Sequence, residues 1–130
     1  FFLIAIVSIS LLVGGIGIMN IMLAAVTQRI KEIGLRKSVG AKSKHIIQQF
    51  LIETIVISFI GAIIGIIIGV LLSFGISLVV NKLGYDWDFV ITSMSIITAC
   101  IISVLIGIIF GLYPAKKAAN YDPISALRYE

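Results

Sequence analysis

Three long runs without charge set the strongest limit on what this chain can fold into. No Asp, Glu, Lys or Arg occurs in residues 1–28, 54–80 or 89–115. A helix needs about 20 apolar residues to cross the hydrocarbon core of a bilayer, and each run is long enough. The whole chain is 60% hydrophobic and 12% charged, against about 45–50% and about 25% in a typical soluble domain. We therefore predict an all-α membrane protein with three transmembrane helices, at about residues 3–28, 46–80 and 93–113.

The basic residues indicate the topology of these spans. Nine of the ten Lys and Arg residues lie in the loop 29–45 or in the tail 114–130, and only Lys82 lies in the turn 81–92. Positive residues gather on the cytoplasmic side of membrane proteins, so we expect the loop and the C-terminus in the cytoplasm and the turn outside. Because these charges flank the spans, the net charge of +4 does not indicate a nucleic-acid partner.

Small residues recur at every fourth position in the second and third spans. The two series are Gly61, Gly65, Gly69, Ser73 and Ser77, and Ser95, Ala99, Ser103, Gly107, Gly111 and Ala115. Such a stripe lets two helices approach closely in lipid, although glycine is also simply more common in membrane helices. We expect an antiparallel hairpin packed through Gly61, Gly65, Gly69, Ser103, Gly107 and Gly111. Replacing Gly65 or Gly107 with Leu should loosen it.

The loop 29–45 combines both signs of charge with apolar residues. Ile30, Ile33 and Val39 form an apolar stripe, and Gly34 and Gly40 interrupt it. This pattern predicts a short amphipathic helix, followed by Ser43 as the N-cap of the second span. Two interpretations remain open at this point. The loop contacts anionic lipid headgroups, or it docks into a groove on another protein.

Two prolines mark the end of the chain. Pro114 cannot continue a helical hydrogen-bond ladder, so we expect the third span to end there. Asp122 followed by Pro123 is a favourable helix start, and it predicts a short C-terminal helix at 123–129.

No pattern of catalytic residues is present in the sequence. There is one His, one Cys, no phosphate-binding loop and no His-Glu-x-x-His motif. The spans also lack the central ionisable residues of ion-coupled transporters. For Glu53, about two turns into the second span, a carboxylate at the membrane interface is favoured over a buried functional acid. We predict no catalytic, cofactor-binding or metal-binding residues, so the chain is not itself an enzyme and any energy for transport comes from elsewhere.

Six motifs in order resemble the FtsX-like permease family of ABC transporters, in its MacB-type branch. They are Gly14-Gly-Ile-Gly-Ile-Met-Asn-Ile-Met-Leu23, Arg29-Ile-Lys-Glu-Ile-Gly-Leu-Arg36, Val39-Gly-Ala41, Gln49-Phe-Leu-Ile-Glu53, Gly111-Leu-Tyr-Pro-Ala115 and Asp122-Pro-Ile-Ser-Ala-Leu-Arg-Tyr-Glu130. Gln28 departs from the pattern, because many relatives have an acid there.

The resemblance implies more than the residues show by themselves. Such permeases have an N-terminal span, a large extracytoplasmic domain and three further spans, in the bacterial cytoplasmic membrane. Residues 1–130 resemble the last three spans as a single domain, so the upstream span and the external domain are expected to be missing. The implied partners are an ABC ATP-binding subunit or domain, which holds ATP and Mg, a second permease copy in a dimer, and an extracytoplasmic adaptor protein.

The resemblance also assigns a role to the loop. It would contain the coupling helix that sits on the ATPase, with Glu32, Gly34, Arg36 and Gly40 matching the family motif. The coupling residues expected on this basis are Arg29, Glu32, Ile33, Gly34, Arg36, Val39 and Gly40.

The implied function is that of a permease in an ATP-driven MacB-type exporter, which expels an antibiotic, a peptide or a lipid-like substrate. An alternative is a transmembrane signalling scaffold, in which the same fold regulates extracellular cell-wall hydrolases without transport. A small independent membrane protein, such as a holin-like oligomer, would require the chain to be complete, and its Phe1 start argues against that.

Overall fold

The computed structural model describes residues 1–122 and folds them into four helices, with no strand among those residues. The helices are α1 (Phe2–Gln28), α2 (Ile30–Ser38), α3 (Ser43–Lys82) and α4 (Ser93–Ala119). α1, α3 and α4 are each long and apolar enough to cross a membrane. The predicted all-α class with three such helices is confirmed, and a short helix does lie between the first two. The helix predicted at 123–129 lies outside the described residues.

The surface of the three long helices suits lipid. Large apolar side chains point outward along all of them, among them Ile9, Ile67, Leu71 and Ile109. In lipid, polar groups must find partners within the protein. The hydroxyls of Ser8 and Thr98 accordingly donate to carbonyl oxygens one turn earlier in their own helices, at 2.8 and 2.7 Å. The chain is a membrane protein.

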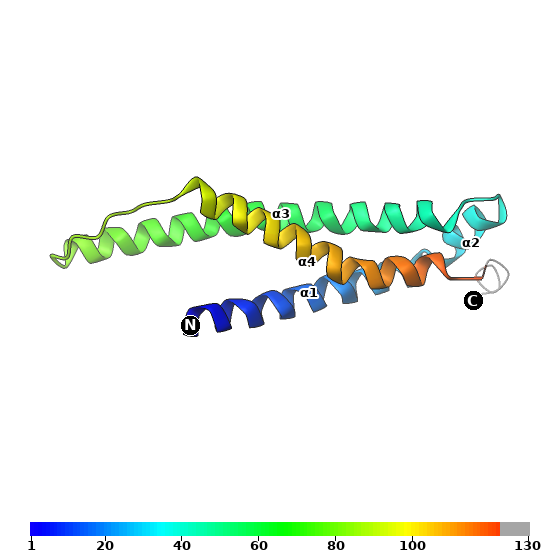
Figure 1. Ribbon diagram of the computed structural model, residues 1–130, viewed down its shortest axis with the longest axis horizontal. Coiled ribbons are helices and arrows are strands. Elements are labelled where there is room, and N and C mark those ends of the chain that lie inside the picture. Colours follow the sequence, from blue (N-terminus) through cyan, green and yellow to red (C-terminus); the bar gives the residue numbers. More distant parts are fainter. Residues whose placement is uncertain (123–130) are drawn as a thin grey trace.

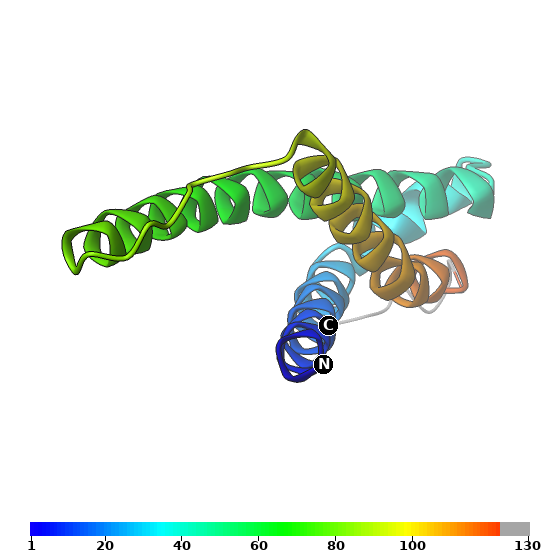
Figure 2. The same cartoon turned by 60° about the vertical axis from the view of Figure 1, so that its left-hand side comes forward.

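α3 and α4 form the predicted antiparallel hairpin, and α1 packs mainly on α4. Figure 1 shows α4, from yellow to orange, lying between α1 in blue and α3 in green. α1 and α3 lie close together near α2 and separate toward their other ends (Figures 1 and 2). We call the end of the bundle that holds α2 the α2 end.

The connection between α3 and α4 folds back along α3 (Figure 1). Trp87 is its anchor, because its backbone N–H donates to Asn81 Oδ1 at 2.8 Å and its carbonyl oxygen accepts from Asn81 Nδ2 and Ser77 Oγ, each at 3.2 Å. The rings of Phe74 and Phe89 add an edge-to-face contact with centroids 5.4 Å apart. The expected turn at 81–92 is therefore an extended segment fastened to α3.

The apolar core sits at the α2 end. α1, α2, α3 and α4 all contribute buried residues, and we call this cluster the four-helix junction: Met22, Val26, Ile33, Ile46, Phe50, Ala115, Ala118 and Ala119.

The end of the third span differs from the prediction, because α4 continues through Pro114 to Ala119. Proline removes one helical hydrogen bond and often bends a helix. Ala115, Ala118 and Ala119 lie beyond it and are buried in the four-helix junction. Their packing outweighs one lost bond, so the helix persists. The orange part of α4 runs in a different direction from its yellow start (Figures 1 and 2).

Candidate functional site

α2 presents two different faces. Ile30 and Ile33 are buried under the ends of the long helices. On the opposite side Leu35 is 58% and Val39 80% exposed, and residues four apart share a helix face. With Lys31 one turn earlier, they form what we call the outward face of α2. The predicted apolar stripe is thus divided, since Ile30 and Ile33 point inward and Val39 points outward.

A glycine turn fixes where α2 ends. Gly40 has φ of +96°, a conformation that side chains with a Cβ disfavour. Its N–H donates to the carbonyl of Lys37, and the N–H of Ala41 donates to the carbonyl of Arg36, each at 3.0 Å. These two bonds make a Schellman cap. Gly40 therefore sets the direction in which the chain leaves α2 and enters α3.

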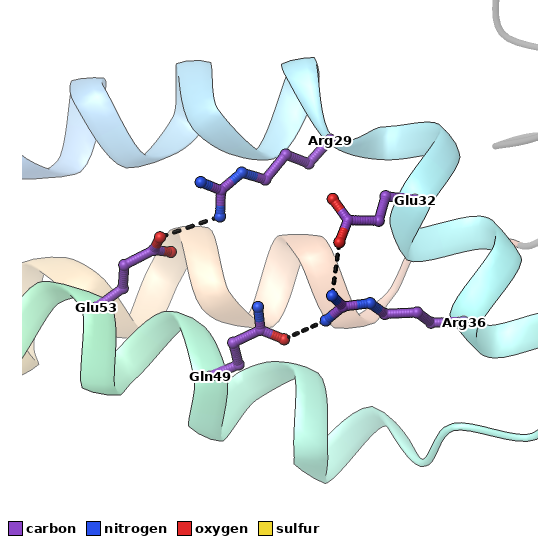
Figure 3. Close-up of polar contacts among 5 residues, drawn as sticks. All are labelled: Arg29, Glu32, Arg36, Gln49 and Glu53. Atoms are coloured by element: carbon purple, nitrogen blue, oxygen red, sulfur yellow. Dashed lines mark hydrogen bonds and ion pairs between the residues drawn. The ribbon is translucent and has the colours of Figure 1, made fainter.

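Charged side chains join α2 to α3 (Figure 3). Arg29 Nη1 pairs with Glu53 Oε1 at 3.0 Å, Arg36 Nη2 pairs with Glu32 Oε1 at 2.6 Å, and Arg36 Nη1 donates to Gln49 Oε1 at 2.6 Å. The four charged side chains are 36% to 51% exposed. Exposed ion pairs contribute about 1 kcal/mol or less each. These contacts therefore fix the orientation of α2 but add little to the stability of the protein.

The expected coupling residues occupy different positions around α2. Arg29, Glu32 and Arg36 lie in the polar network, Ile33 and Gly34 are buried, and Val39 and Gly40 lie at the exposed C-terminal end. Sequence reasoning did not identify Gln49 and Glu53 as partners of the two arginines. Their spacing of four on α3 was the available signal.

The packing glycines of α4 lie directly against α3. A Cβ on Gly107 would lie 2.8 Å from Ser58 Cβ, and one on Gly111 would lie 2.8 Å from Thr54 Cβ. Ser103 Oγ donates to the carbonyl of Ser58 at 3.0 Å. The small residues of α3 that contact these α4 residues are therefore Thr54 and Ser58.

The glycines of α3 are placed differently. A Cβ on Gly61, Gly65 or Gly69 would have no atom within 4 Å among the described residues. Gly61 and Gly65 instead line a cavity of about 1000 Å³ between α1, α3 and α4. The structure does not bring these three glycines against α4.

Among residues 1–122, no three His, Cys, Asp or Glu side chains gather where they could hold a metal ion.

The Gly40 turn gives a first testable expectation. Gly40→Val should destabilise the protein by roughly 1–2 kcal/mol, because a side chain is strained at a positive φ. Gly40→Asn should cost less, because Asn is the other residue found at this cap position. Thermal unfolding of the purified protein in detergent measures both. Gly14→Val is the control, since a Cβ there would have no atom within 4 Å in the part of the chain that the structure describes. Equal unfolding temperatures for Gly40→Val and Gly40→Asn would contradict the expectation.

Comparison with known proteins identifies relatives over nearly the whole chain. Residues 4–123 match the FtsX-like permease C-terminal family. The macrolide export ATP-binding/permease protein MacB of Bdellovibrio bacteriovorus is 53% identical, over 97% of this chain and 19% of its own length. A MacB protein of Yersinia pestis is 51% identical, over 94% and 17%. The ABC transporter permease YknZ of Bacillus subtilis is 50% identical, over 97% and 30%. The chain thus spans less than a third of each relative.

Proposed function

The chain belongs to the FtsX-like permease C-terminal family, and from this premise we propose that it is the transmembrane part of an ATP-driven MacB-type exporter. ATP is bound and hydrolysed on another domain or subunit. Closure of that ATPase moves α2, and the long helices carry the movement across the membrane to expel an antibiotic, a peptide or a lipid-like substrate. Two relatives are named as macrolide exporters, which favours transport over a signalling scaffold.

The outward face of α2 is the observation that supports this proposal most directly. Leu35 and Val39 are large, apolar and exposed at the α2 end, beside the charged Lys31 and Arg36. Apolar anchors among charges on a short helix suit docking into a groove of another protein. The inner face of the same helix is buried against the long helices. A force applied to α2 therefore reaches the spans directly.

The orientation and the assembly belong to the same proposal. The α2 end faces the cytoplasm of a bacterium, because eight of the nine basic residues in the described part of the chain lie in the loop or the tail at that end. The C-terminus is then cytoplasmic and the connection 83–92 is external. A second permease copy completes a dimer, and an adaptor protein binds outside the membrane. The expected coupling residues act as the contact with the ATPase.

Photo-crosslinking tests the docking step. A photo-reactive residue at Val39 of the full-length protein, in native membranes, should yield a crosslinked product that contains the ATP-binding domain or subunit, identified by mass spectrometry. Leu83 is the matched control, because it is 70% exposed but lies at the opposite end of α3. Crosslinks from Val39 to lipid alone, or equal ATPase crosslinks from both positions, would contradict the proposed docking.

A further inference from the structure

α2 is also bound to the C-terminal end of α4. Lys37 Nζ donates to the carbonyl oxygens of Ala119, at 2.6 Å, and Tyr121, at 2.8 Å. The last carbonyls of a helix have no N–H partner within it and carry partial negative charge. The carbonyl of Ala119 also accepts from Ser43 Oγ at 3.3 Å. Ser43 was predicted to cap α3, but that N-cap is Lys42 without a side-chain bond. One side chain of α2 and one of α3 thus meet at the end of α4.

The surroundings of Lys37 distinguish it from the other polar contacts of α2. Its side chain is half-buried, and the neighbouring Ala118 and Ala119 are almost fully buried. By contrast, Arg29 and Glu53 are 44% and 36% exposed. Water weakens an exposed ion pair, whereas a hydrogen bond from a charged donor is among the stronger ones where water is reduced. Among the described residues, Lys37 therefore makes the polar contact between α2 and a long helix that is least exposed to water.

We propose that Lys37 is a positioning residue that makes α4 follow α2. This inference rests on the proposed function, in which the ATPase moves α2. α4 packs on both α1 and α3, so a displacement of its bound end changes two interfaces at once. Phe110 contacts Gly15 of α1, and Gly111 contacts Thr54 of α3. Movement that enters through Lys37 thereby reaches the other two spans through α4.

Distance measurements between spin labels test this role in the full-length protein with its ATPase, in lipid nanodiscs. Cysteines replace Leu3 on α1 and Met94 on α4, which are both exposed and lie far from α2, in a background that carries Cys100→Ser. Distances are measured without nucleotide and with ATP plus vanadate. The native Lys37 protein should show a nucleotide-dependent shift. Lys37→Met should lower the equilibrium ratio of shifted to unshifted molecules about fivefold or more, the lower end of typical coupling between sites.

Three further variants separate positioning from simple stability. Lys37→Arg should keep the nucleotide-dependent change in the spin-label distance, because a guanidinium also donates to carbonyls. Lys37→Gln keeps a donor without the charge and should lose the shift. Lys116→Met is the control, because Lys116 is exposed on α4 and lies outside the outward face of α2, and it should show the same distance shift as the native protein. ATP hydrolysis and the Val39 crosslink, recorded on each protein, should stay unchanged in Lys37→Met.

The outcomes distinguish the two proposals. If the native protein shows no nucleotide-dependent shift, the proposed function fails and the inference fails with it. The native protein can instead show the distance shift while Lys37→Met and Lys37→Gln both show a shift as large as the native one. In that case only the role of Lys37 is overturned, and the proposed function stands. The same holds if Lys37→Arg behaves like Lys37→Gln. Where Lys37→Met does not fold, the comparison of Lys37→Arg with Lys37→Gln decides.

Discussion

Replacing Gly107 with Leu is expected to separate α3 from α4 and to lower the free energy of unfolding by about 3 kcal/mol. A Cβ at this position would lie 2.8 Å from Ser58 Cβ and 3.2 Å from the carbonyl oxygen of Thr54, so a larger side chain forces the two helices apart. Overpacking of this kind costs about 1–3 kcal/mol. Separation also breaks the bond from Ser103 to the carbonyl of Ser58, with a net loss of about 1 kcal/mol.

Gly65→Leu is the matched control for this change. Both substitutions add the same side chain to a helical glycine, but a Cβ on Gly65 meets no atom within 4 Å among the described residues. Its effect should stay within about 0.5 kcal/mol, as for most substitutions without close contacts. Equilibrium unfolding in mixed detergent micelles measures both free energies. The sequence alone predicted that both variants loosen the hairpin, and an equal loss of stability would support that expectation against the structure.

Phe50→Ala should have the largest effect at the four-helix junction, about 3–5 kcal/mol. Phe50 is 3% exposed and packs among residues from all four helices. Truncating a buried phenylalanine removes its apolar contacts and leaves a cavity, with a cost in this range. Ile33 of α2 belongs to the same buried cluster, so α2 loses part of its support. Limited proteolysis after Arg36 or Lys37 should therefore become faster, in step with a lower unfolding temperature.

Phe59→Ala on the same helix controls for the loss of a phenyl ring. Phe59 is 47% exposed, so in a bilayer lipid replaces most of what the ring contacts. We expect little change in the unfolding temperature and none in proteolysis of α2. If Phe59→Ala proved as harmful as Phe50→Ala, the core would not be concentrated at the α2 end.

The long helices could be predicted because lipid leaves few alternatives. A charge-free run of about 27 residues must satisfy its backbone internally, and a helix does so. The end of α4 could not be predicted in the same way. Pro114 is a local signal for termination, whereas the burial of Ala118 and Ala119 depends on α1, α2 and α3 arriving at the same place.

The packed face of α3 shows a second limit of sequence reasoning. Thr54, Ser58 and Ala62 follow one another at intervals of four, as do Gly61, Gly65 and Gly69. These are adjacent ridges of the same helix, and both consist of small residues. The spacing identified the kind of contact, but only the position of α4 determines which ridge it meets.

The contacts of α2 show a third limit. Arg29, Glu32 and Arg36 were identified from one segment, yet Gln49 and Glu53 join them only after the chain reverses at Gly40. The acceptors of Lys37 lie more than 80 residues away and are backbone carbonyls. No side-chain pattern marks a backbone acceptor, so this link is visible only in the fold.

The length of α3 has a mechanical consequence. Its 40 residues form one helix without proline, about 60 Å long at 1.5 Å per residue, or twice the hydrocarbon thickness of about 30 Å. Its first turns are fixed in the four-helix junction, and its last turns carry the segment anchored by Trp87. A rod of this length works as a lever with its fulcrum at the packed end. Tilting it by about 5° displaces the distant tip by about 5 Å, so a small change of angle at the packed end becomes a large displacement at the other end of α3.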